Sequence, residues 1–428
     1  MELKKYKLGE ILDVTRGASL SGEFYAAEGE YVRLTCGNFD YQNNCFKENK
    51  AKDNLYYISD FKPDFLMKEG DIITPLTEQA IGLLGSTAII PESGKYIQSQ
   101  DVAKIVCKEH LLDKDFAFYL ISSNLVKQQL SAAAQQTKIR HTSPDKIKDC
   151  IVWIPELEEQ KRIGKLLRTI DLKIELNRQL NHNLEAMAKQ LYDYWFVQFD
   201  FPDENGKPYK SSGGKMVWDK RLKREIPLLW KAKIVEEVAD VYNGATPSTV
   251  NELNYGGDIV WITPKDLSDQ KQKFVYQGER NISQVGYDSC STHLLPSNTI
   301  LMSSRAPIGL LAIAKTELCT NQGFKSFVSK SKNIATYLYY YLQYHITQIE
   351  QLGTGTTFKE VSREDILKFP MLKPSDNVLD LWEEIVSALN DRQLEIQKEN
   401  ENLIKQRDEL LPLLMNGQVS VNYDLSHD

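Results

Sequence analysis

Arginine, lysine, asparagine and glutamine side chains gather in turn-rich segments of both halves of the chain. Such side chains can hydrogen bond the edges of nucleic-acid bases, and lysine, arginine, serine and threonine can bind phosphates. The segments are residues 77–79, 98–100 and 135–141, followed in the second half by 303–305, 320–322 and 354–359. The candidate contact residues within them are Gln79, Gln100, Lys138, Arg140, Arg305, Gln322, Thr356 and Lys359. An ordinary solvated loop is the alternative for each segment.

No recognisable catalytic motif accompanies these segments. The sequence has no Gly-x-x-x-x-Gly-Lys-Ser/Thr phosphate loop, no Asn/Asp-Pro-Pro-Tyr/Phe adenine-methyltransferase signature and no acidic cluster with a lysine that would indicate a nuclease. Its six cysteines and six histidines are scattered without metal-ligand spacing. We therefore expect no catalytic residue and no metal site. An enzyme with an unrecognised site is one alternative.

The bulk composition is that of a globular protein from a reducing compartment. Of 428 residues, 42% are hydrophobic and 26% are charged, and we find no apolar run long enough to span a membrane. Residues 1–6 lack the apolar core of a signal peptide, so we expect a cytoplasmic protein. The net charge of −7 does not exclude a nucleic-acid partner, because the acidic excess lies in residues 374–428.

The candidate segments occupy matching places in an internal repeat. Several short strings recur in the same order in both halves, and the offset between the copies shrinks along the chain, as it would if the loops differed in length. The matched strings are 14–19 with 241–246, 29–35 with 257–263, 71–74 with 299–302, 81–84 with 308–311, and 117–120 with 335–338. We infer that the chain is one module written twice.

Each globular half is predicted to have an α+β fold. Short β-branched or aromatic runs bounded by Gly, Pro and Asn predict strands at 31–35, 71–74, 86–90 and 102–106, with counterparts in the second half. Helical spacing appears at 116–134 and 334–352. Strands and helices do not alternate regularly, which argues against a doubly wound sheet.

A long heptad-patterned segment follows each globular half. Pro155 and Pro374 open these segments, and the acidic or polar residues after them suit a helix N-terminus. The first seam comprises Ile163, Leu167, Ile170, Ile174, Asn177, Asn181, Leu184, Ala188 and Leu191. The second comprises Trp382, Val386, Leu389, Gln393, Ile396, Asn400, Leu403, Arg407, Leu410 and Leu414. This pattern predicts an antiparallel coiled coil whose polar positions fix its register. Two amphipathic helices, each packed on its own domain, are the alternative.

Two similar domains related by a half turn match the two-fold symmetry of duplex DNA. Each domain could read one half-site, and unlike domains would read a bipartite, non-palindromic target. On this hypothesis Arg305 and Lys138 or Arg140 face the duplex. A duplicated structural adaptor that bridges two proteins without touching DNA would show the same pattern, so it remains a competing interpretation.

Local strings resemble the specificity subunit of type I restriction–modification systems, and the resemblance covers nearly the whole chain. Residues 195–200 look like that family's WF-x-x-FD signature, and 205–214 resemble its central connector. Residues 226–230 are similar to the IP-x-x-W entry to its second recognition domain, and 410–417 resemble its C-terminal ending. Leu228 and Leu229 depart from the polar or glycine pair that is commoner there, which puts the local loop in doubt.

The resemblance implies two target-recognition domains, residues 1–155 and 226–373, that alternate with spacer helices at 156–198 and 374–417. Residues 199–225 would be a connector and 418–428 a tail. It also implies a non-catalytic subunit that binds double-stranded DNA and recruits two adenine methyltransferase subunits and restriction subunits. S-adenosylmethionine, ATP and Mg²⁺ would then be bound by those partners and no cofactor by this chain.

The long helices and an aromatic stretch at the end of the first one are candidates for methyltransferase docking. The stretch contains Tyr192, Trp195 and Phe196. The alternative is that these aromatic side chains only cap the coiled coil.

Overall fold

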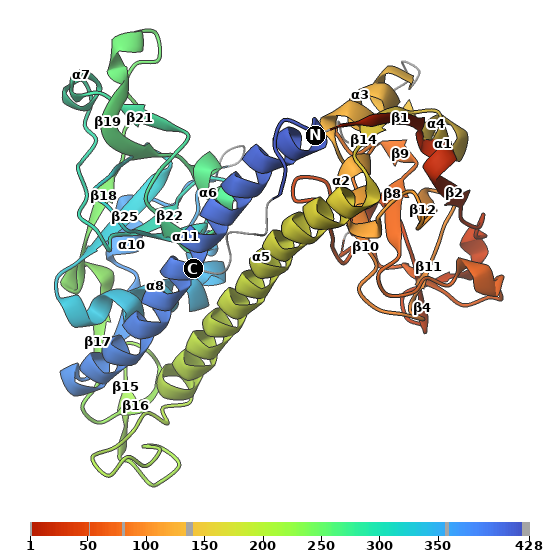
Figure 1. Cartoon of the computed structure of the whole chain (residues 1–428). Coiled ribbons are helices and arrows are strands. Elements are labelled where there is room, and N and C mark those ends of the chain that lie inside the picture. The colour runs from red at the N-terminus through yellow and green to blue at the C-terminus, as the bar shows by residue number, and fades with distance from the viewer. Residues whose placement is uncertain (1, 51, 79–81, 134–139, 356–358, 422–428) are drawn as a thin grey trace, which may run out of the picture. The chain divides into compact units, whose positions relative to one another are not determined.

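The structure, a computed structural model, describes residues 2–50, 52–78, 82–133, 140–355 and 359–421. The chain forms two compact units (Figure 1). Unit 1 contains Met1–Asn177 and Glu399–Asp428, and unit 2 contains Arg178–Lys398. Each unit therefore combines one globular half with a part of each long helix, α5 (Leu157–Tyr192) and α11 (Asp376–Met415).

Unit 1 is built around the antiparallel sheet β10-β8-β12-β2. These strands are β2 (Leu12–Arg16), β8 (Ile72–Pro75), β10 (Ala88–Ile89) and β12 (Val102–Cys107). A second sheet, β11-β4-β7-β3, contains β3 (Tyr25–Ala26), β4 (Tyr31–Arg33), β7 (Tyr56–Tyr57) and β11 (Tyr96–Ile97). Short pairs are β1 (Lys4–Lys7) with β14 (Ile151–Ile154), β5 (Phe39–Asp40) with β6 (Cys45–Phe46), and β9 (Thr77–Glu78) with β13 (Arg140–His141). The helices are α1 (Leu8–Ile11), α2 (Lys114–Ile121), α3 (Asn124–Ala133) and α4 (Pro144–Lys148).

Unit 2 repeats the main sheet with one added edge strand, and its second sheet has three strands in the described part of the chain instead of four. Its main sheet runs β18-β25-β22-β23-β20, and its second sheet runs β21-β19-β24. The strands are β18 (Ala239–Asn243), β19 (Tyr255–Ile262), β20 (Phe274–Val275), β21 (Arg280–Ile282), β22 (Ile300–Ser303), β23 (Leu311–Ala314), β24 (Cys319–Thr320) and β25 (Phe324–Ser329). Two further pairs are β15 (Met216–Asp219) with β16 (Arg224–Pro227) and β17 (Lys231–Ile234) with β26 (Pro370–Lys373). The helices are α6 (Pro264–Gln270), α7 (Gln284–Asp288), α8 (Ala335–Tyr344), α9 (Ile346–Gln351) and α10 (Arg363–Leu367).

Hydrogen-bonded details confirm the predicted repeat. The parallel pairing of β4 with β11 recurs as β19 with β24, and the buried strand β8 recurs as β22. Gly17 and Gly244 hold the same place in the two units, just after β2 and β18. A Cβ at either position would lie within 2.2 Å of a backbone carbonyl oxygen of the neighbouring segment. Only glycine therefore permits this close approach of two backbones.

The helical interpretation of residues 116–134 and 334–352 needs a correction, because each region folds as two short helices. In unit 1, α2 ends at Ile121, and the hydroxyl of the next residue, Ser122, lies 3.1 Å and 3.2 Å from the carbonyl oxygens of Phe118 and Tyr119. A serine hydroxyl satisfies end carbonyls that a continuing helix would use itself. In unit 2, α8 ends at Tyr344 and α9 begins at Ile346, so His345 separates them.

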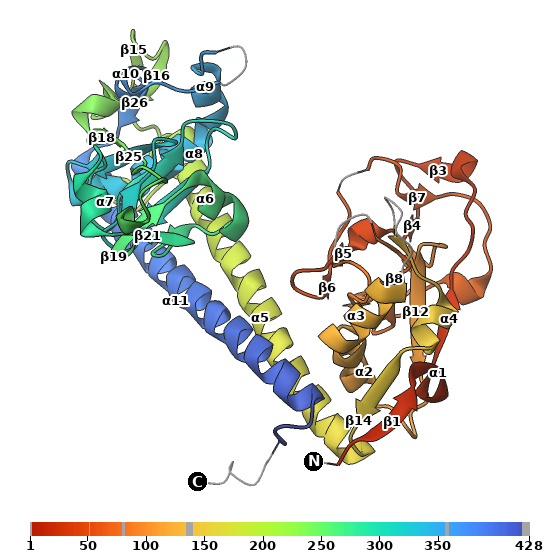
Figure 2. The ribbon, with the colours of Figure 1, turned by 90° about the horizontal axis from the view of Figure 1, so that it is seen from above.

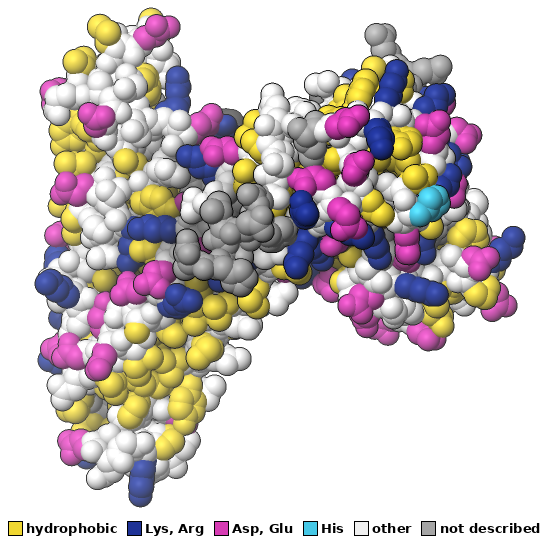
Figure 3. All heavy atoms as spheres, in the orientation of Figure 1, with side chains coloured by type: hydrophobic (Ala, Val, Ile, Leu, Met, Phe, Trp, Pro, Cys, Tyr) yellow, Lys and Arg dark blue, Asp and Glu magenta, His cyan; other side chains and the backbone are white. Residues whose placement is uncertain are grey.

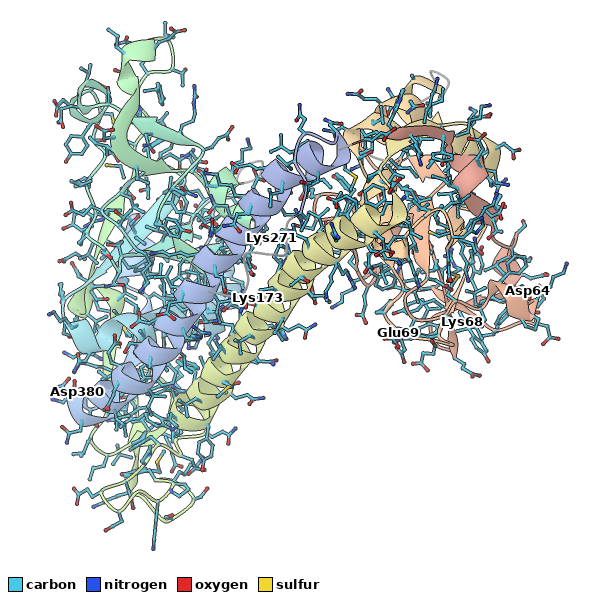
Figure 4. All side chains as sticks on the ribbon, in the orientation of Figure 1. Asp64, Lys68, Glu69, Lys173, Lys271 and Asp380 are labelled. Atoms are coloured by element: carbon cyan, nitrogen blue, oxygen red, sulfur yellow. The ribbon has the colours of Figure 1, made fainter. Side chains whose placement is uncertain are left out.

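The heptad seam is confirmed in unit 1, where α5 and α11 lie side by side and antiparallel (Figures 1 and 2). Leu167 and Ile174 of α5 and Leu414 of α11 are buried. Along the pair, Asp171 binds Arg407 (Oδ1 to Nη1, 3.0 Å), and the Asn177 side-chain amide donates to Asn400 Oδ1 at 3.0 Å. Lys173 of α5, labelled in Figure 4, forms an ion pair with Glu399 of α11 at 3.3 Å. The polar seam positions therefore bond to one another and define the register.

In unit 2 a buried lysine joins the globular part to both helices. Lys273, just before β20, donates to Glu185 of α5 (2.8 Å), to the Tyr340 hydroxyl of α8 (2.6 Å), and to Asn390 (2.7 Å) and Gln393 (3.1 Å) of α11. Its side chain is 11% exposed. Burial lowers the pKa of Lys273 to about 8, although the neighbouring Glu185 carboxylate acts in the opposite direction. The four polar acceptors thus offset only part of the cost of removing this cation from water.

The aromatic stretch after α5 and the segment that follows it belong to the core of unit 2. Residues Asp193–Val197 form a π-helical turn. Phe199 and Phe201 pack on Trp230 with ring centroids 5.4 Å and 4.9 Å apart. The Asp200 carboxylate accepts hydrogen bonds from the Ser211 amide and hydroxyl, and these bonds hold its pKa below the usual value.

Among the described residues, no helix is long and apolar enough to cross a membrane.

Candidate nucleic-acid interface

Three segments far apart in the sequence meet at one place in unit 2. The loop after β22 contributes Arg305, the turn after β24 contributes Gln322, and the segment before α10 contributes Glu360. Backbone hydrogen bonds join them, because the Ser304 amide donates to Gly323 at 2.8 Å and the Ser304 carbonyl accepts from Val361 at 3.0 Å. The structure therefore brings together the three segments that the sequence marked in the second half.

These segments surround an open, polar cavity of about 550 Å³. The cavity is lined by Asn243 and Gly244 at the end of β18, by Ser291 after α7, by Lys325 of β25, and by Arg305, Gln322, Thr354, Glu360, Ser362 and Arg363 of the three segments and the start of α10. Three of them are cationic and one is anionic, so the local charge is positive although the whole chain is acidic. A positive, hydrogen-bonding hollow suits the edge or the backbone of a nucleic acid.

A central carboxylate organises the charges in this cavity. Glu360 accepts from Arg305 Nε through Oε2 at 3.0 Å and from Lys325 Nζ through Oε1 at 3.2 Å. Partial burial would raise the pKa of Glu360, but the hydrogen bonds and charges of Lys325 and Arg305 outweigh it and lower that pKa. The Lys325 side chain is only 5% exposed, whereas that of Arg305 is 49% exposed. The buried cation therefore holds the carboxylate, and the carboxylate holds the exposed guanidinium.

The remaining second-half candidates have different surroundings. Gln322 is exposed and accepts a hydrogen bond from the Thr246 hydroxyl. Lys359 is exposed next to Glu360. Thr356 lies outside the described residues.

Equivalent segments meet in unit 1 with different side chains. The Leu76 amide donates to Asp101 at 2.8 Å, and the Leu76 carbonyl accepts from Thr142 at 2.9 Å. These bonds correspond to those of Ser304 in unit 2. Consequently Thr77 and His141, whose side chains lie 3.3 Å apart, occupy the places of Arg305 and Glu360. The two units therefore present unlike chemistry on the same framework.

The first-half candidates are only partly described. Arg140 is half-exposed and lies 3.7 Å from the buried Glu78 carboxylate. The Gln100 side chain is exposed, while its carbonyl accepts from Arg16 Nε at 2.8 Å. Gln79 and Lys138 lie outside the described residues. DNA contact by the candidates of both units stays a prediction.

The aromatic docking candidates are buried within unit 2. Tyr192, Trp195 and Phe196 are each at most 4% exposed, and Phe196 packs against Tyr337 and Trp382 with centroids 4.7 Å and 4.9 Å away. Burial favours the interpretation in which these side chains close the hydrophobic core at the end of α5. It leaves them almost no surface for a partner, and docking through them stays a prediction.

Several residues of the cavity were not among the sequence candidates, and two of them, Lys325 and Glu360, form its central ion pair. Glu360 lies one position beyond the segment 354–359, and Lys325 lies inside a strand. The available signal was the lysine itself, since Phe324 and Phe327 flank it and a cation within an apolar strand requires a buried partner. Among the described residues, no group of His, Cys, Asp or Glu side chains is arranged to hold a metal ion.

Comparison with known proteins identifies the family. The model of the type I restriction modification DNA specificity domain matches residues 1–186 and again 227–406, which are the two repeats. The chain belongs to the family of specificity subunits of type I restriction–modification systems. These are the non-catalytic subunits that recognise the DNA target, so the family assignment supports a chain without its own enzymatic activity.

Individual relatives agree with this assignment. The type I restriction enzyme MjaIX specificity subunit of Methanocaldococcus jannaschii is 35% identical over 197 residues, and this match spans 45% of the chain and 46% of that protein. The HindI specificity subunit of Haemophilus influenzae is 24% identical over 467 residues, covering 97% of the chain and 99% of that protein. The crystal structure of the type I S subunit from M. genitalium has the same fold, with a TM-score of 0.65 at 16% identity and coverage of 97% and 96%.

Proposed function

We propose that this chain binds a bipartite, non-palindromic duplex target and that each unit reads one half of it. The observation that carries the proposal is the recurrence of one three-segment cluster in both units with different side chains, Thr77 and His141 in one and Arg305 and Glu360 in the other. Because the two backbones are equivalent, the side chains at these positions should approach DNA in the same way in both units. Because the side chains differ, each unit should prefer different bases.

Mapping methylated adenines in the host genome, with and without this chain, tests the proposal. The expected result is a set of sites that disappears with the chain and shares two short, unlike sequence elements separated by a spacer. A single continuous motif, or a palindrome, would contradict it. Binding of the assembled complex to duplex DNA should also fall steeply with salt, whereas a protein-bridging adaptor would show no such binding.

We further propose that the long helices recruit the methyltransferase subunits through exposed apolar side chains. Helical spacing places Leu172 (53% exposed), Leu176 (60%), Leu180 (37%) and Met187 (55%) on one face of α5. Figure 3 shows apolar side chains gathered over the unit 2 portions of α5 and α11. On α11, Leu381 is 38% exposed and Ile385 is 37% exposed. Exposed apolar surface of this kind marks protein contacts.

Leu176→Glu and Met187→Glu test this docking surface. Each should abolish co-purification with the methyltransferase subunits while leaving the thermal unfolding of the free chain unchanged. Val250→Glu is the matched control, because Val250 is 91% exposed but lies elsewhere in unit 2. Intact complexes with both helix variants would refute docking on this face.

Restriction subunits would join the methylating complex, and we propose that S-adenosylmethionine, ATP and Mg²⁺ bind to the partners rather than to this chain. Equilibrium dialysis with labelled S-adenosylmethionine should therefore detect binding to the complex and none to the purified chain. We also propose a cytoplasmic location, where chromosomal DNA is accessible. The six free thiols are compatible with that reducing compartment.

A further inference from the structure

Arg305 is held in one orientation before any ligand arrives. Its Nε donates to Glu360, and the backbones of the two residues pair as a β-bridge. The other side of Glu360 is also fixed, since its amide and carbonyl exchange hydrogen bonds with Thr354 at 3.0 Å and 3.1 Å. Lys325 Nζ donates a hydrogen bond to the second carboxylate oxygen of Glu360 at 3.2 Å. A long, flexible side chain has thereby lost much of the freedom that binding would otherwise have to remove.

This restraint leaves the terminal amino groups of Arg305 available. Within the described part of the chain, neither Nη1 nor Nη2 has a hydrogen-bond partner, and half of the side chain is exposed at the rim of the cavity. The two terminal groups form a planar fork of donors. Such a fork matches a pair of acceptors, and the two candidates in DNA are the O6 and N7 atoms of guanine and two oxygens of a phosphate.

The adjacent carboxylate favours guanine over phosphate. Glu360 is ionised, because its pKa is lowered, and its side chain is 36% exposed. A phosphate on Arg305 would bring a second anion close to this one. The other cation paired with Glu360, Lys325, is too buried to offset it, and the Nε of the cavity's third cation, Arg363, donates to the Val241 carbonyl at 2.6 Å. The guanine edge is neutral and meets no such repulsion.

We propose that Arg305 reads a guanine in the half of the target bound by unit 2, with Glu360 and Lys325 as its positioning residues. The inference rests on the proposed DNA-recognition function and names its chemistry at one site. It does not extend to unit 1, where Thr77 and His141 occupy the equivalent places. The two halves of the target are thus read by different means.

The test uses the complex of the full chain with its methyltransferase subunits. Methylation mapping gives the wild-type target, and ultraviolet cross-linking assigns one half of it to unit 2. Binding to duplexes changed at each position is then compared for wild type, Arg305→Ala, Arg305→Lys and Glu360→Gln. Arg221→Ala is the charge-matched control, because Arg221 is an exposed residue of the turn that joins β15 to β16.

Arg305→Ala should lose about 10- to 100-fold of the preference for guanine at one position and keep its preference elsewhere. Replacing that guanine by 7-deazaguanine should weaken wild-type binding and leave the Arg305→Ala complex unaffected, because only the wild type uses N7. Glu360→Gln should lose part of the same preference without losing affinity for unrelated DNA. Arg305→Lys, which keeps the charge but not the fork, should behave like the alanine variant if both fold.

Several results would overturn the inference. A unit 2 half-site without guanine would do so directly. A uniform loss of affinity for all sequences in Arg305→Ala would indicate that Arg305 contacts a phosphate. Full retention of the guanine preference in Arg305→Lys or Glu360→Gln would show that the two terminal amino groups of Arg305, as Glu360 positions them, do not determine it. A wild-type complex that binds every duplex equally would instead refute the proposed function itself.

Discussion

Replacing Lys273 by methionine should strongly destabilise unit 2. The substitution keeps an unbranched chain of similar volume but removes the cation that joins α5, α8, α11 and the segment before β20. Glu185, whose side chain is 21% exposed, loses its main counter-ion. Asn390 and Gln393 of α11 each lose a hydrogen-bond donor.

The magnitude follows from the partners that remain. Removing one member of a buried ion pair costs about 3–5 kcal/mol. Glu185 keeps the Tyr340 hydroxyl at 3.1 Å and Lys189 at 3.9 Å, so the lower end of that range applies. A loss of about 3 kcal/mol in a unit of this size corresponds to a decrease of roughly 6–12 °C in melting temperature.

The pH dependence of this effect has a definite sign. Burial lowers the pKa of Lys273 from its usual 10.5 to about 8. Between these two pH values the unfolded chain binds more protons than the folded one, so the contribution of Lys273 to stability increases as the pH rises. The gap in unfolding free energy between the wild type and Lys273→Met should therefore widen between pH 8 and pH 10.5.

Scanning calorimetry of the full chain measures both effects. Lys273→Met, Glu185→Leu and the double variant complete a cycle, in which the double variant should be less destabilised than the sum of the single variants. Lys265→Met is the control, because its ion pair with Glu279 is 65% exposed on both sides. Additive changes, or a loss below about 1 kcal/mol, would show that the four hydrogen bonds of Lys273 do not hold the unit together.

Gly244→Ala should cost more than about 2 kcal/mol in chemical denaturation, since its Cβ would lie 2.1 Å from a backbone oxygen, whereas Gly22→Ala meets nothing closer than 3.8 Å and should be neutral. Equal effects would contradict this. Trp195→Ala should lower the melting temperature of the free chain, because removing a buried tryptophan costs about 3–5 kcal/mol; lost complex assembly at unchanged stability would instead make it a docking residue. Asn177→Leu should destabilise unit 1 by about 1–3 kcal/mol, and adding Asn400→Leu should recover most of that in thermal unfolding. No recovery would refute the seam pairing.

The features that repeat were predictable from the sequence. Heptad spacing is a local property, so Leu167 and Trp382 could be assigned to a buried seam without knowing anything of the rest of the fold. The duplicated strings likewise placed Gly17 and Gly244 at matching positions of the two halves. The heptad spacing and the repeated strings are both patterns of residues close together in the sequence, so they can be recognised without the tertiary structure.

The features that depend on contacts between distant residues were not predictable. Spacing alone could not show that the helices end before Ser122 and His345, because the apolar periodicity continues past both residues. Burial of Trp195 depends on α8 and α11, which lie far along the chain. Lys325 and Glu360 became a pair only when β25 met the segment before α10. Ion pairs of this kind leave no periodic trace in the sequence.

The path of the chain between the units affects how the gene can recombine. The chain leaves unit 1 after Asn177 and re-enters it at Glu399, and the Asn177 amide donates to Glu399 at 2.7 Å. Unit 2 is thus inserted into the sequence of unit 1, and the two points of unit 1 that flank the insertion, Asn177 and Glu399, lie next to each other. A recombination event that exchanged the codons for residues 178–398 would replace the whole of unit 2 and leave the hydrophobic cores of both units intact. New targets could therefore arise by shuffling genes, in one step, with no gradual redesign of loops.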